Sequence, residues 1–261
     1  MDDDITFQVE DLVATITINR PDTYNSLTPH AYQEMNRALK YAENDPSVRC
    51  IILTGKGKAF SSGAYLAKDE LETTFSYEGL RKTITEDLNP LIKTITTNQK
   101  PVIAAVNGPC AGASAGLVLA CDLAVASESA YLLFPFVNIG LATDGGPGFF
   151  LTRLVGPKRA MEILLLGEKI SAEKCCELGL FNRVVAAENF QKEVKELAGK
   201  LAHGPFSQTL IKSAVHQALA MNLDEYLDLE AEYQPSASRS LDAREGINAF
   251  LEKRKPQFRG R

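Results

Sequence analysis

The fold of this chain is decided by Pro101-Val102-Ile103-Ala104-Ala105-Val106 and the residues that follow, Asn107-Gly108-Pro109-Cys110-Ala111-Gly112. The first run is apolar and reads as a buried strand, and the second contains the glycines and proline of a tight connection. Small residues from about Ala113 to Cys121 then predict a closely packed helix, and Leu123-Ala124-Val125-Ala126 predicts the next strand. A strand, a helix and a strand in this order are typical of a right-handed crossover between parallel strands.

The same alternation extends on both sides of this stretch. Alternating apolar residues within Ile5–Ile18 predict a β-hairpin, and Cys50–Thr54 predicts another buried strand. A helical period covers about Thr28–Glu43 and about Phe75–Thr97, and Pro90 is expected to kink or interrupt the second helix. The sequence therefore predicts one α/β domain that ends in helices only: about Glu188–Leu201, Pro205–Ala220, Leu223–Ser236 and Leu241–Lys255.

The composition excludes several classes of function. The chain has 261 residues, of which 45% are hydrophobic and 23% charged, and its formal net charge is -5. This acidic balance argues against bulk nucleic-acid binding, although local Lys and Arg residues can still hold phosphates. The five cysteines form no CxxC pair and the three histidines are scattered, so we expect reduced thiols, no metal site and no Ser-His-Asp triad. An acidic N-terminus without a membrane-spanning stretch predicts a cytoplasmic protein with no membrane partner.

One carboxylate, Asp144, lies in a loop that is otherwise free of charge, within Phe134–Gly146. A lone acid among apolar neighbours is poorly solvated, which raises its pKa toward the range useful for acid–base chemistry. The alternative is that Asp144 caps the helix predicted to follow, because Asp is a favoured N-cap residue. This segment alone favours the cap, and the rest of the chain favours the catalytic interpretation.

Two loops have the same predicted arrangement: a buried strand ends, and small residues then lead into the start of a helix. They are Ser62-Gly63-Ala64 and Ala111-Gly112-Ala113. Small residues let backbone N–H groups approach a ligand, and two N–H groups aimed at one point would form an oxyanion hole. Taken singly, each loop is more often a site of tight packing. Neither matches a dinucleotide or P-loop pattern, so a nicotinamide or ATP site is not expected.

Further short motifs follow one another along the chain. They are Ile18-Asn19-Arg20-Pro21 with Asn25-Ser26-Leu27, Lys58–Ala64, Lys100–Gly108, Ala120–Leu123, Ile139-Gly140-Leu141, Arg153–Gly156, Ala172-Glu173 with Gly179-Leu180, and Glu245–Arg254. In these motifs the chain resembles the enoyl-CoA hydratase/isomerase (crotonase) superfamily over nearly its whole length.

The resemblance implies an α/β fold, a crotonase-like spiral of ββα turns with a C-terminal helical trimerisation region. It places the spiral core with the acyl-CoA site in residues 1–190 and the helical region, for oligomerisation and CoA contact, in residues 191–261. It also implies an acyl-CoA thioester substrate, a homotrimer or a dimer of trimers, and an enolate held by two backbone N–H groups.

Carried over by position, the resemblance assigns the two N–H donors to Ala64 and Ala113. Asp22 stands where relatives commonly have Lys, which weakens the expectation of one CoA-phosphate contact. Tyr65 stands where many relatives have Asp and is expected near the acyl chain, while Phe134, Phe136 and Leu141 are candidates for an apolar wall or for plain core packing. The implied substrate-binding residues are Thr23, Tyr24, Ser26, Tyr65, Leu66, Gly112, Phe136, Leu141, Phe250 and Lys253.

The reaction is suggested by departures from the family pattern. The two glutamates of true hydratases fall on Gly116 and Phe136, so both are absent. Asp144 remains, at the position where single-carboxylate isomerases of the phenylacetate-pathway type carry their acid. One carboxylate suffices to move a proton from one carbon to another, whereas hydration must also activate water. We therefore predict an isomerase that converts Δ3- to Δ2-enoyl-CoA or rearranges a ring-modified phenylacetyl-CoA, with no cofactor beyond the coenzyme A of the substrate.

Three alternatives stay open at this point. A hydratase-like lyase would need a different arrangement of groups. A 4-chlorobenzoyl-CoA dehalogenase-like hydrolase would use Asp144 as a nucleophile, but the assisting His of those enzymes falls near Asn89 and their Trp on Phe136, and this chain contains no Trp. A non-catalytic acyl-CoA-binding trimer would need none of these groups.

Overall fold

A computed structural model describes residues 4–66 and 76–260 of the chain. Within these residues, strands of an α/β fold form a large sheet in the order β1-β2-β3-β4-β6-β9. β1 and β2 pair antiparallel as the predicted hairpin, and the remaining neighbours pair in parallel, as the crossover pattern predicted. The bounds of these strands are β1 (Ile5–Glu10), β2 (Val13–Ile18), β3 (Cys50–Gly55), β4 (Val102–Val106), β6 (Leu123–Ser127) and β9 (Arg183–Val185).

A second, smaller sheet contains β5 (Pro109–Ala111), β7 (Tyr131–Leu133) and β8 (Ile170–Ser171). Two isolated parallel bridges are also present: Ser61 pairs with Cys110 of β5, and Leu27 pairs with Ala64. Successive turns of the chain thus add a strand to the large sheet, a short pairing along the small sheet, and a helix. This is the spiral of ββα turns that the sequence motifs implied.

The helices and helical turns occupy much of the remaining described chain. They are η1 (Pro21–Thr23), α1 (Pro29–Asn44), α3 (Tyr77–Lys82), η3 (Thr83–Leu88), α4 (Asn89–Thr97), α5 (Ala113–Ala120), η4 (Pro135–Ile139), α6 (Pro147–Leu166), α7 (Ala172–Glu177), η5 (Ala187–Asn189), α8 (Phe190–Ala202), α9 (Ser207–Ala218), α10 (Leu223–Ser238) and α11 (Leu241–Leu251). The predicted interruption at Pro90 is present: η3 is a π-helical segment, and Pro90 lies in the first turn of α4 directly after it. The wider turn makes room for a residue that lacks an N–H group and would clash with the preceding turn.

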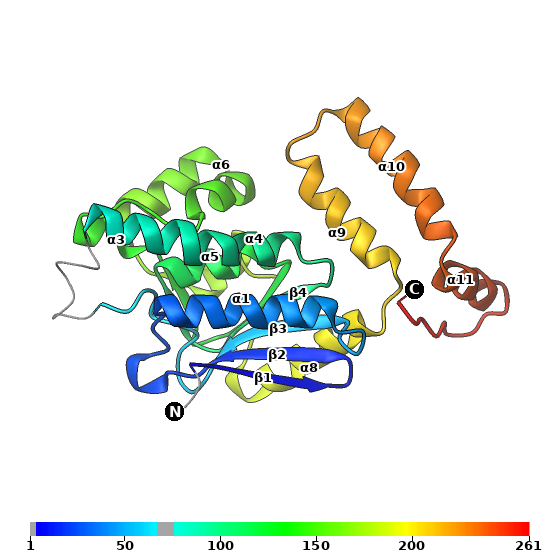
Figure 1. Ribbon diagram of the computed structural model, residues 1–261, viewed down its shortest axis with the longest axis horizontal. Coiled ribbons are helices and arrows are strands. Elements are labelled where there is room, and N and C mark those ends of the chain that lie inside the picture. Colours follow the sequence, from blue (N-terminus) through cyan, green and yellow to red (C-terminus); the bar gives the residue numbers. More distant parts are fainter. Residues whose placement is uncertain (1–3, 67–75, 261) are drawn as a thin grey trace.

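The large sheet has a hydrophobic layer on each face. Alternate residues of β3 point to opposite sides, so Ile51 and Leu53 join the cluster that includes the buried face of α1, while Cys50 and Ile52 pack with α8. Figure 1 shows α1 and α8 on opposite sides of the sheet. The boundary expected at residues 190/191 falls at the start of α8, and because α8 packs on the sheet, the helices that leave the core are α9, α10 and α11 (Figure 1).

The helices α9, α10 and α11 extend away from the body of the molecule (Figure 1). Large apolar side chains of these helices remain exposed, among them Ile211, Val215, Leu219, Leu223, Leu227 and Leu251. No helix within the described residues is both long and apolar enough to cross a membrane.

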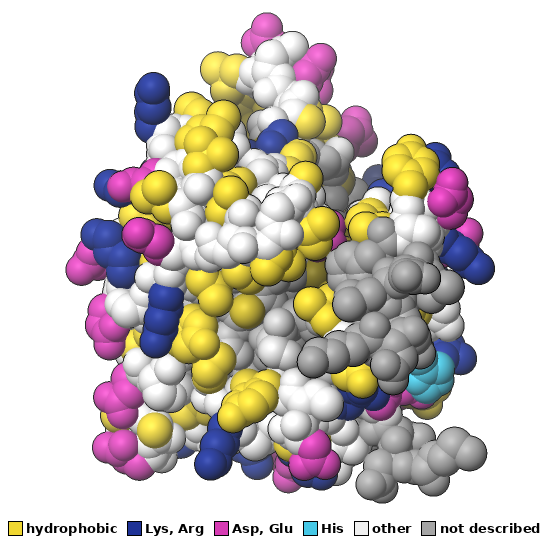
Figure 2. All heavy atoms as spheres, turned by 90° about the vertical axis from the view of Figure 1, so that its left-hand side faces the viewer, with side chains coloured by type: hydrophobic (Ala, Val, Ile, Leu, Met, Phe, Trp, Pro, Cys, Tyr) yellow, Lys and Arg dark blue, Asp and Glu magenta, His cyan; other side chains and the backbone are white. Residues whose placement is uncertain are grey.

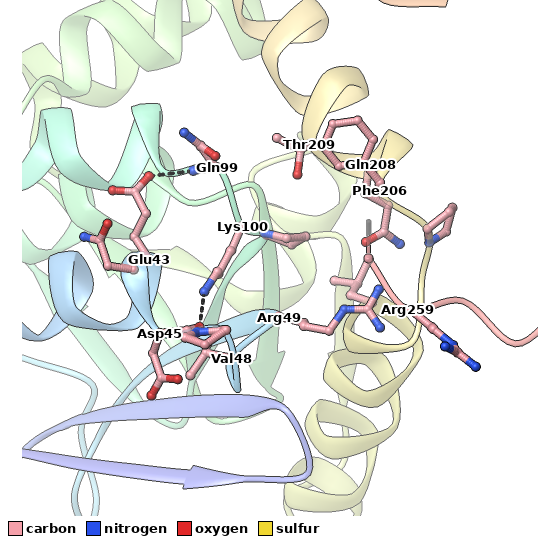
Figure 3. Close-up of a pocket in the computed structure, with 16 residues that line it drawn as sticks. Glu43, Asp45, Val48, Arg49, Gln99, Lys100, Phe206, Gln208, Thr209 and Arg259 are labelled. Carbon is pink, nitrogen blue, oxygen red and sulfur yellow. Dashed lines mark hydrogen bonds between the residues drawn. The ribbon is translucent and has the colours of Figure 1, made fainter. Parts of the chain in front are cut away.

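A cavity of about 460 Å³ lies where α9 leaves the core, near the C-terminal end of α1 (Figure 3). Two of its cationic side chains, Lys100 and Arg49, bind main-chain carbonyls. Lys100 Nζ donates to the carbonyls of Ala42 and Asp45, both at 2.6 Å, and Arg49 donates to the carbonyls of Gly204 and, at 3.3 Å, Phe258. Burial lowers the pKa of both Lys100 and Arg49. These bonds tie the tail of the chain to the core, so the cavity belongs to the architecture of this junction.

Candidate active site

The predicted site residues of the core gather at one edge of the large sheet. The parallel strands β2, β3 and β4 end on the left side of Figure 1, where α1 begins. Binding sites of α/β proteins typically lie at this carboxyl edge. Figure 2 looks straight onto this side and shows hydrophobic side chains gathered across its middle, with charged side chains mostly toward the margin. Such a surface suits a ligand with an apolar group and charged ends.

Asn25 fixes the loop that carries three of the predicted CoA-binding residues. It is completely buried and has a left-handed backbone, with φ 58°. Its Nδ2 donates to the carbonyls of Lys56 at 2.9 Å and Ala59 at 2.7 Å, and its Oδ1 accepts from the N–H of Arg20 at 3.0 Å. Sequence reasoning did not single out this residue as functional, although it belongs to the quoted motif Asn25-Ser26-Leu27. Its bonds hold the Thr23–Ser26 loop against the glycine-rich loop that follows β3.

The predicted CoA-binding loop and the Ala64 loop are in direct contact. Ser62 N–H donates to the carbonyl of Tyr24 at 2.9 Å, and Ser62 Oγ donates to the carbonyl of Thr23 at 3.0 Å. Ser26 Oγ donates to Thr23 Oγ1 at 2.8 Å. Tyr24 is exposed, as are Tyr65 and Leu66. The structure thus brings Thr23, Tyr24, Ser26, Tyr65 and Leu66 together, with aromatic and apolar surface available to a ligand.

The backbone N–H group of Ala64 is turned away from its neighbouring strand. Leu27 N–H donates to the carbonyl of Gly63 at 2.8 Å, and Tyr65 N–H donates to the carbonyl of Leu27 at 2.9 Å. In a parallel bridge of this kind, the residue between the two bonds points its own N–H to the opposite side. Ala64 N–H makes no hydrogen bond within the described residues and is available to a ligand.

Ala113 presents a second such N–H group. It is the first residue of α5, and the first N–H groups of a helix have no acceptor within the helix. Gly112 precedes it with φ 61°. Gly63 has φ 90°, and a Cβ at this position would lie 2.7 Å from the carbonyl oxygen of Ala111 and 3.5 Å from Gly112 Cα. Only glycine allows this approach, which places the Ala64 and Ala113 loops side by side.

Asp144 lies in the connection between η4 and α6 and is partly buried. The N-cap of α6 is Gly146, and no side chain caps this helix, so the alternative of Asp144 as a cap is wrong. The Oδ1 atom of Asp144 is enclosed and has no hydrogen-bond partner within the described residues. Burial raises the pKa of Asp144 to about 6. The loop therefore holds a carboxyl group whose pKa lies closer to neutral pH than that of an exposed aspartate.

The loop that carries Asp144 packs directly on α5. Gly145 has φ 72°, and a Cβ there would lie 3.2 Å from the carbonyl oxygen of Ala113. A Cβ at Gly116 would lie 2.3 Å from the carbonyl oxygen of Gly145. The backbone of the Asp144 loop thus fills the space that a side chain at position 116 would need. Position 116 cannot carry a glutamate while this loop keeps its place.

The aromatic candidates for an acyl wall differ in burial. Phe134 is completely buried and is part of the core, so the packing interpretation holds for it. Phe136 in η4 is 7% exposed, and the N–H of Leu141 donates to its carbonyl at 2.9 Å. Leu141 is exposed. Phe136 and Leu141 therefore stand together on the segment that leads to Asp144.

Residues 8–261 match the family model described as enoyl-CoA hydratase/isomerase. The chain belongs to the enoyl-CoA hydratase/isomerase family. It is 41% identical to the 1,2-epoxyphenylacetyl-CoA isomerase of Escherichia coli (strain K12) over 254 residues, which cover 97% of each chain. It is 39% identical to a probable enoyl-CoA hydratase of Rhodobacter capsulatus, over 98% of each chain. The crystal structure of subunit I of an enoyl-CoA hydratase from Geobacillus kaustophilus superposes with a TM-score of 0.91 at 37% identity, covering 99% of this chain and 98% of that one.

Two of the predicted site residues lie away from the Thr23–Ser26, Ala64 and Ala113 loops in the single chain. Phe250, on α11, is 82% exposed, and Lys253 follows the same helix. Figure 1 shows α11 on the opposite side of the molecule from the start of α1. One chain therefore does not bring Phe250 and Lys253 together with Asp144.

Sequence reasoning also missed two buried polar residues, Tyr32 on α1 and Asp87 in η3. A single aromatic residue on the apolar face of a helix is normally a core residue, so the sequence offered no signal for Tyr32. Asp87 lies in the π-helical segment, whose extra residue per turn shifts the face that is buried. The sequence period alone predicted a helix here but not which of its residues turn inward.

Proposed function

We propose that this protein is an acyl-CoA thioester isomerase that shifts a double bond and uses Asp144 as its single proton carrier. The observation that carries the proposal is the enclosed Oδ1 atom of Asp144, which has no hydrogen-bond partner within the described residues. It belongs to a loop packed on α5, close to the N–H groups of Ala64 and Ala113, and these N–H groups also make no hydrogen bond in the described part of the chain. A pKa of about 6 leaves this group mostly ionised at neutral pH and still able to hold a proton during turnover. Both properties are required of a group that removes a proton and returns it.

The chemistry follows from these groups. The Asp144 carboxylate takes a proton from C2 of a 3-enoyl thioester, and the electron pair spreads onto the thioester oxygen and C4. The N–H groups of Ala64 and Ala113 donate to the oxygen, each contributing about 3 kcal/mol to stabilising the enolate. The Asp144 carboxyl group then returns the proton to C4, which leaves the double bond between C2 and C3. Protons and electrons balance, and no cofactor is needed beyond the coenzyme A of the substrate.

Proton transfer is favoured over water addition by the surroundings of Asp144. The positions of the two hydratase glutamates hold Gly116 and Phe136. The Gly145 carbonyl occupies the space that a side chain at Gly116 would need, and Phe136 is buried. The substrates that fit are a plain 3-enoyl-CoA or a ring-modified phenylacetyl-CoA, the second suggested by the name of the Escherichia coli relative. The loops around Thr23, Tyr24, Ser26, Tyr65, Leu66 and Gly112 would hold the coenzyme A part.

We also propose a homotrimer, or a dimer of trimers, in which α11 of one copy reaches the site of the next. The support is the projection of α9, α10 and α11, their exposed apolar side chains, and the outward position of Phe250 and Lys253 (Figure 1). Light scattering measures the mass of the particle, and Phe250→Ala should raise KM for acyl-CoA with little change in kcat. A stable monomer with full activity would contradict this arrangement.

The experiment that tests the function is incubation with short- and medium-chain 3-enoyl-CoA thioesters, followed through the rising absorbance of the conjugated 2-enoyl product. Wild type should form the product. Asp144→Asn should not, while it still binds acyl-CoA. The matched control is Asp11→Asn, which changes an exposed carboxylate in the β1–β2 turn and should keep full activity.

Each alternative has its own signature in the same set of assays. Loss of absorbance with crotonyl-CoA would indicate a hydratase, and chloride release from 4-chlorobenzoyl-CoA a dehalogenase. Binding of acyl-CoA without turnover of any of these compounds, and without an effect of Asp144→Asn, would indicate a non-catalytic binding protein. Any of these results without isomerisation would refute the proposed function.

A further inference from the structure

Two buried serines join the Ala64 loop to the Ala113 loop. Ser61 lies shortly before Ala64 in the chain, and Ser114 directly follows Ala113 on α5. Both serines are completely buried. Serine is mostly an exposed residue, and its hydroxyl competes with the hydrogen bonds of a helix. A buried pair at the junction of the two loops therefore calls for an explanation.

The hydroxyl of Ser114 bonds both loops at once. Its Oγ donates to the carbonyl oxygen of Ala111 at 2.7 Å and to the carbonyl oxygen of Ser61 at 3.0 Å, so that one proton is shared between two acceptors. The first carbonyl belongs to the loop that leads to Ala113, and the second belongs to the loop that leads to Ala64. Because one atom bonds both loops, it fixes the distance between them at this point.

A thiol completes the bonding of the Ser114 hydroxyl. Cys110 Sγ lies 3.5 Å from Ser114 Oγ. Burial raises the pKa of the Cys110 thiol to about 12, so the thiol keeps its proton at neutral pH and can donate it to the serine oxygen. The Ser114 hydroxyl thus has a donor on one side and the two carbonyl acceptors on the other. This arrangement directs its proton toward the loops.

The side chain of Ser61 holds the residue before Ala64. Gly63 N–H donates to Ser61 Oγ at 3.1 Å. The backbone of Ser61 is bound to the second loop, since its carbonyl also accepts from Ala111 N–H at 3.0 Å. The Ala111 carbonyl oxygen is the same atom that would lie 2.7 Å from a Cβ at Gly63. The closest approach of the two loops and the serine hydrogen bonds therefore involve the same atoms.

The relative position of the two N–H donors depends on such contacts. An oxyanion hole stabilises a developing charge because its donors already point at one place before the reaction begins. Ala64 and Ala113 belong to segments far apart in the sequence, so nothing in the local chain fixes one N–H group relative to the other. The serine hydrogen bonds join these segments directly beside the two donors.

Resting on the proposed acyl-CoA function, we propose that Ser61 and Ser114 are positioning residues that set the spacing and direction of the Ala64 and Ala113 N–H groups around the thioester oxygen. Neither serine has surface for a substrate to touch, since both are completely buried. Loss of the Ser114 hydroxyl should therefore weaken the hydrogen bonds to the thioester oxygen and leave binding of the coenzyme A part unchanged.

The test measures how strongly the protein polarises the thioester carbonyl of a ligand that cannot react. Isotope-edited infrared spectroscopy gives the carbonyl stretching band of octanoyl-CoA that carries carbon-13 in its carbonyl group, both free and bound. In wild type the bound band should lie at lower wavenumber than the free band, because two N–H donors weaken the C=O bond. In Ser114→Ala about half of this displacement should be lost, with Kd for octanoyl-CoA changed less than about twofold. In the isomerisation assay, kcat should fall about tenfold at nearly constant KM.

Two further variants complete the experiment. Ser61→Ala removes the acceptor of Gly63 N–H and should move the bound band in the same direction as Ser114→Ala. Ser238→Ala is the matched control. Ser238 Oγ donates to the carbonyl of Pro235, three residues earlier on α10, at 2.8 Å, as Ser114 does to Ala111, but Ser238 is exposed. Its loss should leave the band and Kd unchanged.

An unchanged band in both Ser114→Ala and Ser61→Ala would overturn the proposal. A band that stays in place while Kd rises and the free energy of unfolding falls would also overturn it, because this pattern indicates packing alone. Failure of both variants to fold would indicate the same structural role. The absence of any displacement in wild type would refute the pair of N–H donors, and the positioning proposal with it.

The infrared result does not depend on turnover. A displacement that requires Ser114, in a protein that isomerises no 3-enoyl-CoA, would refute the proposed reaction and leave the positioning proposal standing.

Discussion

Gly116→Ala is the sharpest test of how the loop that carries Asp144 is held. A Cβ at position 116 would lie 2.3 Å from the carbonyl oxygen and 2.9 Å from the carbonyl carbon of Gly145. Both atoms belong to backbone, so no flexible side chain can move aside. A tolerable contact requires about 3.3 Å, so the Gly145 peptide must retreat by roughly 1 Å.

This displacement is transmitted to the proposed catalytic group because Asp144 is the residue next to Gly145. A misplacement of about 1 Å at a reacting group costs on the order of 100-fold in rate. We therefore expect kcat for 3-enoyl-CoA isomerisation to fall about 100-fold in Gly116→Ala. KM should change less than threefold, because the nearest atoms to the added Cβ belong to Gly145 and not to the Thr23–Ser26 loop. The free energy of unfolding should fall by about 1–3 kcal/mol from overpacking.

Gly199→Ala is the matched control. Gly199 is also a helical glycine, on α8, and a Cβ there would meet nothing within 4 Å. This substitution should keep activity and raise stability by up to about 1 kcal/mol, because alanine is the better helix former. Steady-state kinetics and urea denaturation of both variants provide the measurement. Wild-type kcat in Gly116→Ala would refute the packing of the Asp144 loop on α5.

Two further predictions concern the charge of Asp144 and the bonds of Asn25. The raised pKa of Asp144 requires that kcat/KM rise with pH through about 6, as the base ionises; a flat profile between pH 5 and 8 would contradict its role. The folded-state pKa lies above the ordinary value of 3.8, so this group favours folding below pH 4 and loses that contribution as pH rises past 6. Asp144→Asn should therefore be more stable than wild type by up to about 3 kcal/mol at pH 8 and equal to it at pH 4, as urea titrations at both pH values would show. Asn25→Ala breaks three hydrogen bonds of a buried side chain and should lower the free energy of unfolding by about 3 kcal/mol, and a loss below 1 kcal/mol would show that the two loops hold each other without it.

Hydrophobic and small-residue patterns predicted many of the strands and helices, because the burial that these patterns indicate also stabilises the fold. The apolar run Val102–Val106 could only be a buried strand, and the small residues after Gly112 could only be a closely packed helix. The packing of α8 on the sheet was harder to predict, since it depends on which apolar face of the helix meets which face of the sheet. The pairings of β5, β7 and β8 involve two or three residues each, too few for a periodic signal.

The sequence by itself determined the family, the spiral of strands and helices, and the identity of the lone carboxylate. It did so because motif order, hydrophobic period and the absence of other charges are properties of the chain alone. It left Asp144 open between a helix cap and an acid–base group, and only the fold excluded the cap, by placing Gly146 at that position. The fold also encloses the Oδ1 atom of Asp144, which supports the proposed acid–base role. Tyr32, Asp87 and the Gly116–Gly145 contact likewise come from segments far apart in sequence. Burial, and with it the pKa of a side chain, depends on which of these distant segments meet.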